Sequence, residues 1–242
     1  MTVSGALDGG GESGPARLVA GPEGLALHAA DGTMVRAATE LLGAPRRGRD
    51  LLARAVRSAL KGGAGGATAG AQPELVDATA GLGADSFHLA SLGLQVTMIE
   101  REPLVAALLV DALKRAAAGQ LGEAARLAAA NLTLVQADAT EILLERLGRG
   151  ERPAVVYLDP MYPKQGKAAL PGKGMALFRD LVGADADSAR LLAAAQSAAT
   201  RRVVVKRPLK APFLGGLQPS GSLAGSTTRY DLYPPATPGT SE

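Results

Sequence analysis

The sequence predicts an α/β fold in which a mostly parallel sheet carries helices on both faces, with a small N-terminal subdomain beside it. After residue 71, short apolar segments alternate with longer helical ones, which is the pattern of a parallel sheet. The chain has 242 residues and is 47% hydrophobic, which is enough for one sizeable core. We therefore expect a disordered N-terminus over 1–15, a subdomain with a Gly-rich linker over 16–70, and the main domain over 71–242.

The N-terminal part has its own turn and helix signals. Gly21-Pro22 and Asp31-Gly32 separate short apolar pieces, and a turn between such pieces predicts a hairpin. Residues 46–61 have apolar side chains on one side and basic ones elsewhere, which predicts a basic amphipathic helix. The glycines of 62–70 predict a flexible linker to the main domain.

In the main domain, apolar runs predict buried parallel strands at 75–79, 94–99, 132–136, 154–158 and 202–206. Helices are expected over 84–92, over 103–117, and between about 175 and 199. Pro103 suits the first position of its helix, because the N–H that proline lacks would have no partner there. The tail pieces 213–217 and 227–233 predict a final antiparallel pair.

Composition excludes several classes of site. The chain has no cysteine, which excludes disulfides, thiolate metal sites and cysteine nucleophiles. His28 and His88 lie far apart, so we expect no metal site; His88 more simply packs in the first helix of the main domain and His28 in the hairpin. No apolar run approaches the roughly 20 residues of a membrane span, and no leader pattern is present. The expected protein is cytoplasmic and has no membrane partner.

The positive charge is clustered although the net charge is only +3. One cluster lies within 46–61, a second contains Lys164, Lys167 and Lys173, and a third surrounds Lys206 and Arg207. Each cluster is explained equally well by a solvated surface. The last two follow the ends of predicted strands, which favours a polyanionic substrate such as nucleic acid.

Four carboxylates fall at the ends of successive predicted strands, and they are Asp77, Glu100, Asp138 and Asp159. Ligands of open α/β sheets bind at the carboxyl ends of the strands. Any one of these residues could instead cap a helix. Four of them at one edge favour a ligand-binding site.

The segment between the first strand and its helix is a glycine turn. Gly81 and Gly83 let the backbone approach a ligand closely. A dinucleotide fingerprint needs a third glycine where this chain has Ser86, so a nicotinamide enzyme is disfavoured. An S-adenosylmethionine (SAM) site suits the turn better, with Asp77 and Asp85 near the amino-acid end of the cofactor.

The remaining acidic positions suit the nucleoside end of the same cofactor. The carboxylate of Glu100 can accept hydrogen bonds from a ribose diol, and Asp138 can accept one from the adenine amine. Arg101 either packs against the adenine or contacts solvent.

The segment Asp159-Pro-Met-Tyr-Pro163 suits methylation of a base amine. Its prolines restrict the turn and remove donors, which leaves carbonyl acceptors available. Asp159 and the carbonyl of Pro160 can accept the amine hydrogens and hold the amine for transfer. Tyr162 can stack on a flipped-out base, worth roughly 1–3 kcal/mol. The alternative is a rigid surface turn with a half-buried tyrosine.

The basic residues near this segment are candidate RNA contacts. Lys164, Lys167 and Lys173 follow it directly and can contact phosphates beside the target base. Lys206 and Arg207 end the fifth strand at the same edge.

Five blocks together resemble the RsmJ family of bacterial 16S ribosomal RNA guanine-N2 methyltransferases. They are Val76–Gly83, Met98–Arg101, Pro103–Leu109, Val155–Pro163 and Val203–Pro208, within a resemblance over about 25–235. The resemblance implies a Rossmann-like class I methyltransferase fold, with a mostly parallel seven-stranded sheet and an antiparallel edge strand. It implies SAM as cofactor and 16S ribosomal RNA or the small ribosomal subunit as partner.

The resemblance also implies cofactor-binding positions, which fall on Ala84, Asp85, Glu100, Arg101, Asp138, Ala139 and Asp159. The chain departs from the family pattern at Ala84, where the family has arginine, and at Asp138-Ala139, where it has two serines. Two alternatives stay open, namely an amine methyltransferase acting on DNA or protein, and a noncatalytic RNA-binding protein. The second predicts loss of the carboxylates or of Asp159, and all of them are present.

Overall fold

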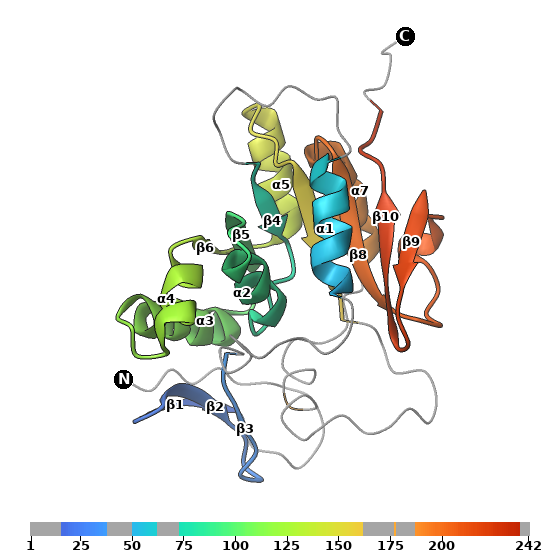
Figure 1. Ribbon diagram of the computed structural model, residues 1–242. Coiled ribbons are helices and arrows are strands. Elements are labelled where there is room, and N and C mark those ends of the chain that lie inside the picture. Colours follow the sequence, from blue (N-terminus) through green and yellow to red (C-terminus); the bar gives the residue numbers. More distant parts are fainter. Residues whose placement is uncertain (1–15, 38–49, 62–72, 162–176, 178–186, 238–242) are drawn as a thin grey trace.

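The protein is built on one large sheet, with a smaller sheet beside it (Figure 1). The computed structural model describes residues 16–37, 50–61, 73–161, 177 and 187–237. The strands of the large sheet are β4 (Leu75–Asp77), β5 (Val96–Glu100), β6 (Leu132–Gln136), β7 (Val155–Leu158), β8 (Arg202–Pro208), β9 (Gly221–Ala224) and β10 (Thr228–Tyr233). They lie in the order β6-β5-β4-β7-β8-β10-β9. The predicted α/β fold with a seven-stranded sheet is confirmed.

The strand order reverses at β4, and this creates the place for a site. β4 pairs in parallel with β5 on one side and with β7 on the other. Ligands of open α/β sheets bind where the chain departs in opposite directions from neighbouring strands. β10 is the antiparallel strand, paired with β8 and with the edge strand β9.

Two layers of helices cover the sheet. One face carries α1 (Leu51–Lys61), α2 (Ala84–Ser91), α3 (Pro103–Ala117) and α4 (Glu123–Ala129), and the other carries α5 (Ala139–Gly148) and α7 (Ser188–Ala198). Alternate strand residues enter the two cores, as Met98 and Ile99 of β5 do. Both faces are therefore buried, which explains the continuous apolar runs of the parallel strands. Among the described helices, none combines the length and apolar character needed to cross a membrane.

The N-terminal sheet contains β1 (Arg17–Gly21), β2 (Gly24–His28) and β3 (Met34–Val35), all antiparallel. The hairpin predicted from the two turn signals is confirmed. This sheet docks on α3, where the backbone N–H of Leu25 donates to Asp111 Oδ2 at 2.9 Å and the Arg115 guanidinium donates to the Glu23 carbonyl. The N-terminus over 1–15 and the linker over 62–70 lie outside the described residues.

The prediction for residues 213–217 is wrong. This segment contains a 3₁₀ turn, η2 (Leu214–Gly216), and β9 follows it and pairs with β10. Gly215 and Gly216 have φ angles of 59° and 71°, which a strand does not adopt. Leu214 is 3% exposed and packs into the second core, which accounts for the apolar character that suggested a strand.

The helices also differ from expectation in extent. α4 and α5, of seven and ten residues, had no predicted counterpart. α1 begins after Asp50, whose Oδ1 accepts a hydrogen bond from the N–H of Ala53 at 3.0 Å. Residues 46–49 of the predicted basic helix lie outside the described residues.

Glu74 joins three elements at the start of β4. Its carboxylate accepts hydrogen bonds from Thr97 Oγ1 on β5 at 2.8 Å and from two guanidinium nitrogens of Arg146 on α5 at 2.9 and 2.5 Å. Burial alone would raise the pKa of Glu74, but the bonds from Arg146 and Thr97 outweigh it and lower this pKa below its ordinary value.

We expect Glu74→Gln to lower the free energy of unfolding at pH 7 by about 1–3 kcal/mol, because Arg146 loses a charged partner. A carboxyl group with a lowered pKa in the folded state stabilises the fold above its unfolded pKa. That contribution disappears as the pH falls through the folded pKa. The difference between wild type and variant in urea unfolding should therefore shrink in acid.

Glu123→Gln is the matched control, since it removes a surface ion pair with Arg126 within one helix. It should change stability little. Equal stability of wild type and Glu74→Gln at pH 7 would contradict the role of Glu74.

Candidate functional site

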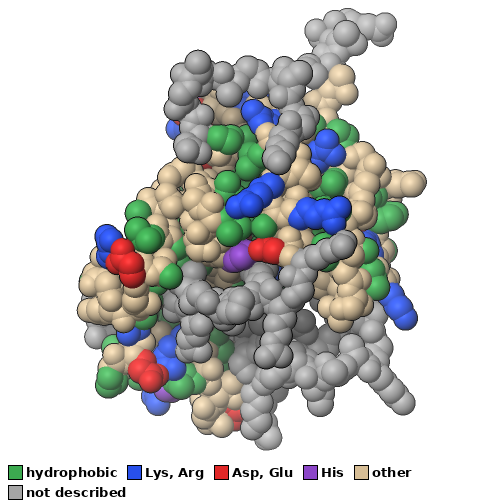
Figure 2. Space-filling view, in the orientation of Figure 1, with side chains coloured by type: hydrophobic (Ala, Val, Ile, Leu, Met, Phe, Trp, Pro, Cys, Tyr) green, Lys and Arg blue, Asp and Glu red, His purple; other side chains and the backbone are tan. Residues whose placement is uncertain are grey.

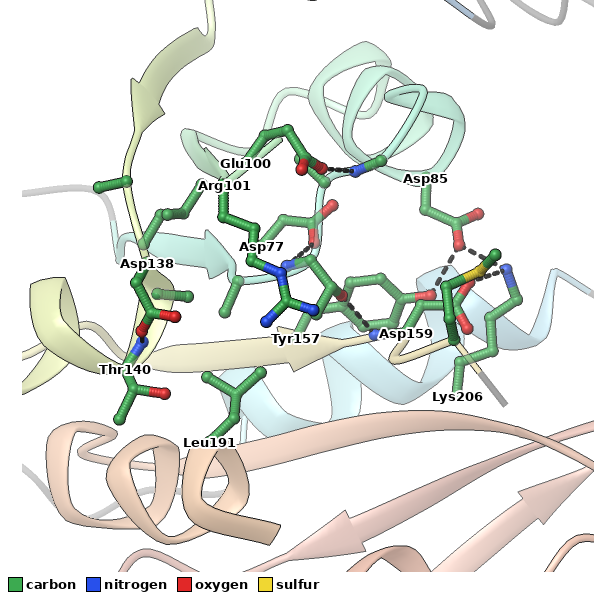
Figure 3. A pocket seen from close by; sticks show the side chains of 18 of the residues that line it. Asp77, Asp85, Glu100, Arg101, Asp138, Thr140, Tyr157, Asp159, Leu191 and Lys206 are labelled. Carbon is green, nitrogen blue, oxygen red and sulfur yellow. Dashed lines mark hydrogen bonds and ion pairs between the residues drawn. The ribbon is translucent and has the colours of Figure 1, made fainter. Parts of the chain in front are cut away.

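A cavity of about 300 Å³ opens at the carboxyl ends of β4, β5, β6 and β7 (Figure 3). Its walls come from the glycine turn after β4, the ends of β5 and β6, the residues after β7, and the start of α7. A cavity of this volume lies at the lower end of the usual range for small-molecule sites. It is at the sheet edge where the sequence predicted convergence of the carboxylates.

The glycine turn is fixed from both sides. The N–H of Gly81 donates to Glu100 Oε2 at 2.8 Å, and the N–H of Ala80 donates to the Ile99 carbonyl at 3.1 Å. Gly83 has a φ of 84°, and a Cβ there would lie 2.8 Å from Leu109 Cδ2 and 3.1 Å from Phe87 Cδ2. Gly83 thus allows close packing of the turn on α2 and α3, and Gly81 is the glycine that lines the cavity.

Glu100 ends β5 and is 6% exposed. Besides the bond from Gly81, its Oε1 accepts a hydrogen bond from the N–H of Glu102 at 2.8 Å. Burial raises the pKa of Glu100, and the two backbone bonds oppose this rise. Each carboxylate oxygen can accept more than one bond, so these contacts leave capacity for a ligand hydroxyl.

Asp77 lies under the glycine turn and is 1% exposed. Its Oδ2 accepts a hydrogen bond from Ser86 Oγ at 2.5 Å, and its Oδ1 accepts one from the N–H of Thr79 at 3.2 Å. Burial nevertheless raises the pKa of Asp77 to about 7, and the nearby carboxylates of Asp85 and Asp159 add to the rise. These contacts make Asp77 a support for the turn and the start of α2.

Four groups form a hydrogen-bonded chain at one end of the cavity (Figure 3). Tyr157 Oη donates to Asp85 Oδ2 at 2.6 Å, and Lys206 Nζ donates to Asp85 Oδ2 and to Asp159 Oδ2, both at 2.8 Å. Thr79 Oγ1 accepts a bond from the backbone N–H of Asp159 at 2.6 Å, which fixes the backbone after β7.

The electrostatics of this chain keep Lys206 charged. Burial by itself would lower the pKa of Lys206, but the carboxylates of Asp159 and Asp85 outweigh it and raise this pKa above its ordinary value. Burial raises the pKa of Asp159, and the ammonium of Lys206 opposes that rise. Burial also raises the pKa of Tyr157, so its hydroxyl stays protonated and remains a donor.

Comparison with known proteins decides the family. Residues 13–235 match the model of a family described as "Putative SAM-dependent methyltransferase". The chain belongs to this family of SAM-dependent methyltransferases. A solved SAM-dependent methyltransferase of Neisseria gonorrhoeae is 35% identical, covers 98% of this chain and 90% of its own, and superposes with a TM-score of 0.72.

Curated relatives agree with the predicted resemblance. "Ribosomal RNA small subunit methyltransferase J" of Stutzerimonas stutzeri is 52% identical over 165 residues, 68% of this chain and 62% of that protein. The protein of the same name from Pseudomonas aeruginosa strain UCBPP-PA14 is 51% identical over 169 residues, 70% of this chain and 63% of that protein. The match therefore spans somewhat more than three fifths of these relatives.

The methyltransferase cavity fits the family's cofactor. SAM carries a ribose diol, an adenine amine, an ammonium group and a carboxylate. Its described lining offers several carboxylate acceptors and the ammonium of Lys206. In the described part of the chain, no group of three or more His, Cys, Asp or Glu side chains is placed to hold a metal ion.

Asp138 lines the cavity and also begins a helix. Its Oδ1 accepts hydrogen bonds from the N–H groups of Thr140 at 2.8 Å and Glu141 at 3.2 Å. The helix-cap alternative weighed from the sequence is therefore correct for one oxygen of Asp138. Contact of Asp138 with adenine stays a prediction.

An ion pair connects two walls of the cavity. Arg101 Nη1 lies 3.3 Å from both oxygens of Asp187, just before α7, and both side chains are 39% exposed. Asp187 had no predicted role. It lies far from the recognised motifs in sequence, so spacing did not point to it.

Most of the predicted cofactor residues line the methyltransferase cavity. These are Asp77, Gly81, Ala84, Asp85, Glu100, Arg101, Asp138, Ala139 and Asp159. Gly83 lies behind the turn, and Pro160 is buried next to Asp159 without lining the cavity. Tyr162, Lys164, Lys167 and Lys173 lie outside the described residues.

Two predicted RNA contacts have partners within the protein, and their role in RNA binding stays a prediction. Lys206 does not project toward a phosphate on the surface, because its ammonium lies between Asp85 and Asp159. Arg207 is 5% exposed and donates to the Pro212 carbonyl at 3.4 and 3.2 Å. Successive residues of a strand point to opposite faces, so the pair could not share one surface.

Sequence reasoning missed Tyr157, Thr79 and Ser86 at this site. Tyr157 lies inside an apolar strand, where it reads as a core residue. Its signal was the period of two, because Tyr157 and Asp159 fall on the same side of an extended segment. Ser86 was considered only as a missing glycine, although a small donor after the turn can bind a buried carboxylate.

We expect the stability of the methyltransferase to fall as the pH rises from 5 to 8, in part because of Asp77. The folded state holds the Asp77 proton up to a pKa of about 7, against an ordinary value of 3.8. The stabilisation is complete below the ordinary value and is lost as the pH rises through the folded pKa. Asp77→Asn carries no charge, so its urea-unfolding free energy should fall less over this range.

Asp31→Asn serves as the control, because it changes an exposed carboxylate in the turn between β2 and β3. The pH dependence of that variant should match wild type. The same match for Asp77→Asn would rule out a raised pKa at Asp77.

Proposed function

We propose that this protein transfers a methyl group from SAM to the exocyclic N2 amine of a guanine in 16S ribosomal RNA. The observation that carries the proposal is the carboxylate of Asp159, which faces the cavity and is held by Lys206 beside the glycine turn. The relatives named as small-subunit ribosomal RNA methyltransferases support the RNA substrate. The choice of guanine N2 rests on the family resemblance.

The residues after β7 hold the amine in this proposal. When bound, SAM supplies a methyl group on a positively charged sulfonium. The carboxylate of Asp159 and the carbonyl of Pro160 accept the two amine hydrogens and so direct the nitrogen lone pair toward that methyl group. As the N–C bond forms, the S–C bond of the sulfonium breaks and leaves a neutral thioether, and the nitrogen loses one proton, for which the Asp159 carboxylate is the acceptor. The bond from Asp159 N–H to Thr79 fixes the backbone that carries both acceptors.

The cofactor assignment is supported by the cavity lining. All the positions that the resemblance implied, from Ala84 to Asp159, line the same cavity. Glu100 binds the ribose diol and Asp138 the adenine amine, while Asp85 lies nearest the amino-acid end. Arg101 and Asp187 form an ion pair among the residues that line the cavity.

A basic helix face supports a nucleic-acid substrate. On the side seen in Figure 2, Lys and Arg side chains gather over α1, where Arg54 and Arg57 are exposed. Such a face attracts a phosphate backbone without reading its sequence. Tyr162, Lys164, Lys167 and Lys173 are proposed as contacts to the base and its flanking phosphates. A ribosomal substrate implies a cytoplasmic location.

The deciding experiment is transfer of radiolabelled methyl groups to 16S RNA and to small ribosomal subunits from cells that lack this protein. Nucleoside analysis should find N2-methylguanosine. Label in DNA or protein alone would replace the proposal with the other amine methyltransferase. Cofactor binding without transfer to any acceptor would favour the noncatalytic RNA-binding protein.

We expect Asp159→Ala to lower kcat by about 100-fold or more, because the amine loses a positioned acceptor. Affinity for S-adenosylhomocysteine, measured by calorimetry, should fall by a smaller factor. Transfer at the wild-type rate by the purified variant would show that Asp159 is not catalytic.

We expect Glu100→Gln to weaken S-adenosylhomocysteine binding by about 10- to 100-fold, the usual effect of losing a charged hydrogen-bond acceptor. Glu102→Gln is the matched control, because Glu102 caps α3 through the N–H of Leu104 and does not line the cavity. Its calorimetric affinity should stay near wild type. Unchanged binding by Glu100→Gln would exclude the ribose assignment.

A further inference from the structure

We infer that Lys206 is a positioning residue for methyl transfer, whose ammonium holds the carboxylate of Asp159 as an acceptor for the substrate amine. The inference rests on the proposed function, because that proposal assigns Asp159 to the amine. It replaces the expectation that Lys206 contacts RNA.

Sheet register brings the two side chains together. Leu158 of β7 pairs with Val205 of β8 in parallel register, so Asp159, directly after β7, and Lys206, in β8, are the next residues along the two chain segments. Side chains at the same register of a parallel pair point to the same face. Lys206 is also paired with Tyr230 of β10, and the preceding residue, Val205, is paired with β7 on the other side. The ammonium of Lys206 is therefore positioned by a paired strand, β8.

The exposed fractions of the Asp159, Lys206 and Asp85 side chains indicate which of them contacts the substrate. The side chain of Asp159 is 39% exposed, that of Lys206 is 29% exposed, and that of Asp85 is 12% exposed. Asp159 is thus the most accessible of the three, and Lys206 binds both carboxylates (Figure 3). Lys206 binds Oδ2 of Asp159, and the assignment leaves Oδ1 to the amine.

Charge compensation explains why the position needs a cation. Burial is the largest cause that raises the pKa of Asp77 and of Asp159, and nearby carboxylates add to it: Asp85 and Asp159 act on Asp77, and Asp85 acts on Asp159. Burial also raises the pKa of the Tyr157 phenol, which stays neutral there. Lys206 and the neighbouring Arg207 oppose this effect on Asp159. A protonated Asp159 would present a donor to the amine, so loss of Lys206 would remove the acceptor that transfer needs.

Three variants test the inference. Lys206→Met removes the charge and keeps much of the side-chain volume, Lys206→Arg keeps the charge, and Lys210→Met is the control at an exposed lysine four residues later. For Lys206→Met we expect kcat to fall about 100-fold, with the KM for RNA within about threefold of wild type. The acid limb of its pH–rate profile should move to higher pH. Lys206→Arg should recover part of kcat, and Lys210→Met should keep it.

A measurement without turnover makes the test independent of the RNA substrate. Carbon-13 NMR of labelled aspartate carboxyls, assigned with Asp159→Asn, follows the titration of Asp159. In folded Lys206→Met, or in Lys206→Gln if the first variant does not fold, this carboxyl should titrate at higher pH than in wild type.

The outcomes separate the two claims. An unchanged Asp159 titration in Lys206→Met would overturn the inference. A normal kcat with a raised and less salt-dependent KM for RNA would also overturn it, because that result indicates a phosphate contact. A wild-type protein that methylates no RNA would overturn the proposed function. In that case the titration alone would still decide whether Lys206 controls Asp159.

Discussion

The carboxyl groups of Asp77, Glu100 and Asp159 meet around one cavity because β4, β5 and β7 end at the same sheet edge, and Asp85 at the start of α2 joins them. Like charges so close together, with Asp77 and Glu100 buried, would destabilise the fold unless each were compensated. The chain compensates them in three ways. Asp77 receives a hydroxyl and a backbone N–H, Glu100 receives two backbone N–H groups, and Asp85 and Asp159 share the ammonium of Lys206.

The same contacts that compensate charge also shape the site. Glu100 cannot bind the N–H of Gly81 without fixing the glycine turn against the end of β5. Asp77 binds Ser86 and thereby fixes the start of α2. The residues proposed to bind cofactor are therefore also residues on which the local fold depends, and a functional site on rigid elements needs this second set of contacts. Substitutions here act on stability and binding together, which is why paired measurements and matched controls are needed.

Local patterns predicted much of the fold and part of the site. Apolar runs located the parallel strands, and polar residues at their ends located the cavity, because both depend on neighbours in sequence. The partner of Lys206 could not be predicted in this way, since it depends on the register between β7 and β8. The role of Tyr157 was not predicted because this residue lies in an apolar strand. The apolar segment Leu214–Gly216 forms a 3₁₀ turn and not a strand, because its glycines adopt positive φ angles. The contact of Lys206, the role of Tyr157 and the 3₁₀ turn depend on long-range packing or on backbone angles.

The charge distribution would place the phosphates of an RNA substrate on the protein surface and its target base in the cavity. The cavity is acidic, which disfavours entry of a phosphate and suits a neutral base and a cationic cofactor. Exposed arginines lie on α1. His88 Nε2 of α2 lies 2.5 Å from Asp50 Oδ2, and this contact connects the start of α1 to α2, the helix that follows the glycine turn. A backbone held on the basic helix would thus be held by the same rigid unit that forms the cofactor turn. Under the proposed function, the two charge environments select different parts of one nucleotide, with phosphates outside and the base within.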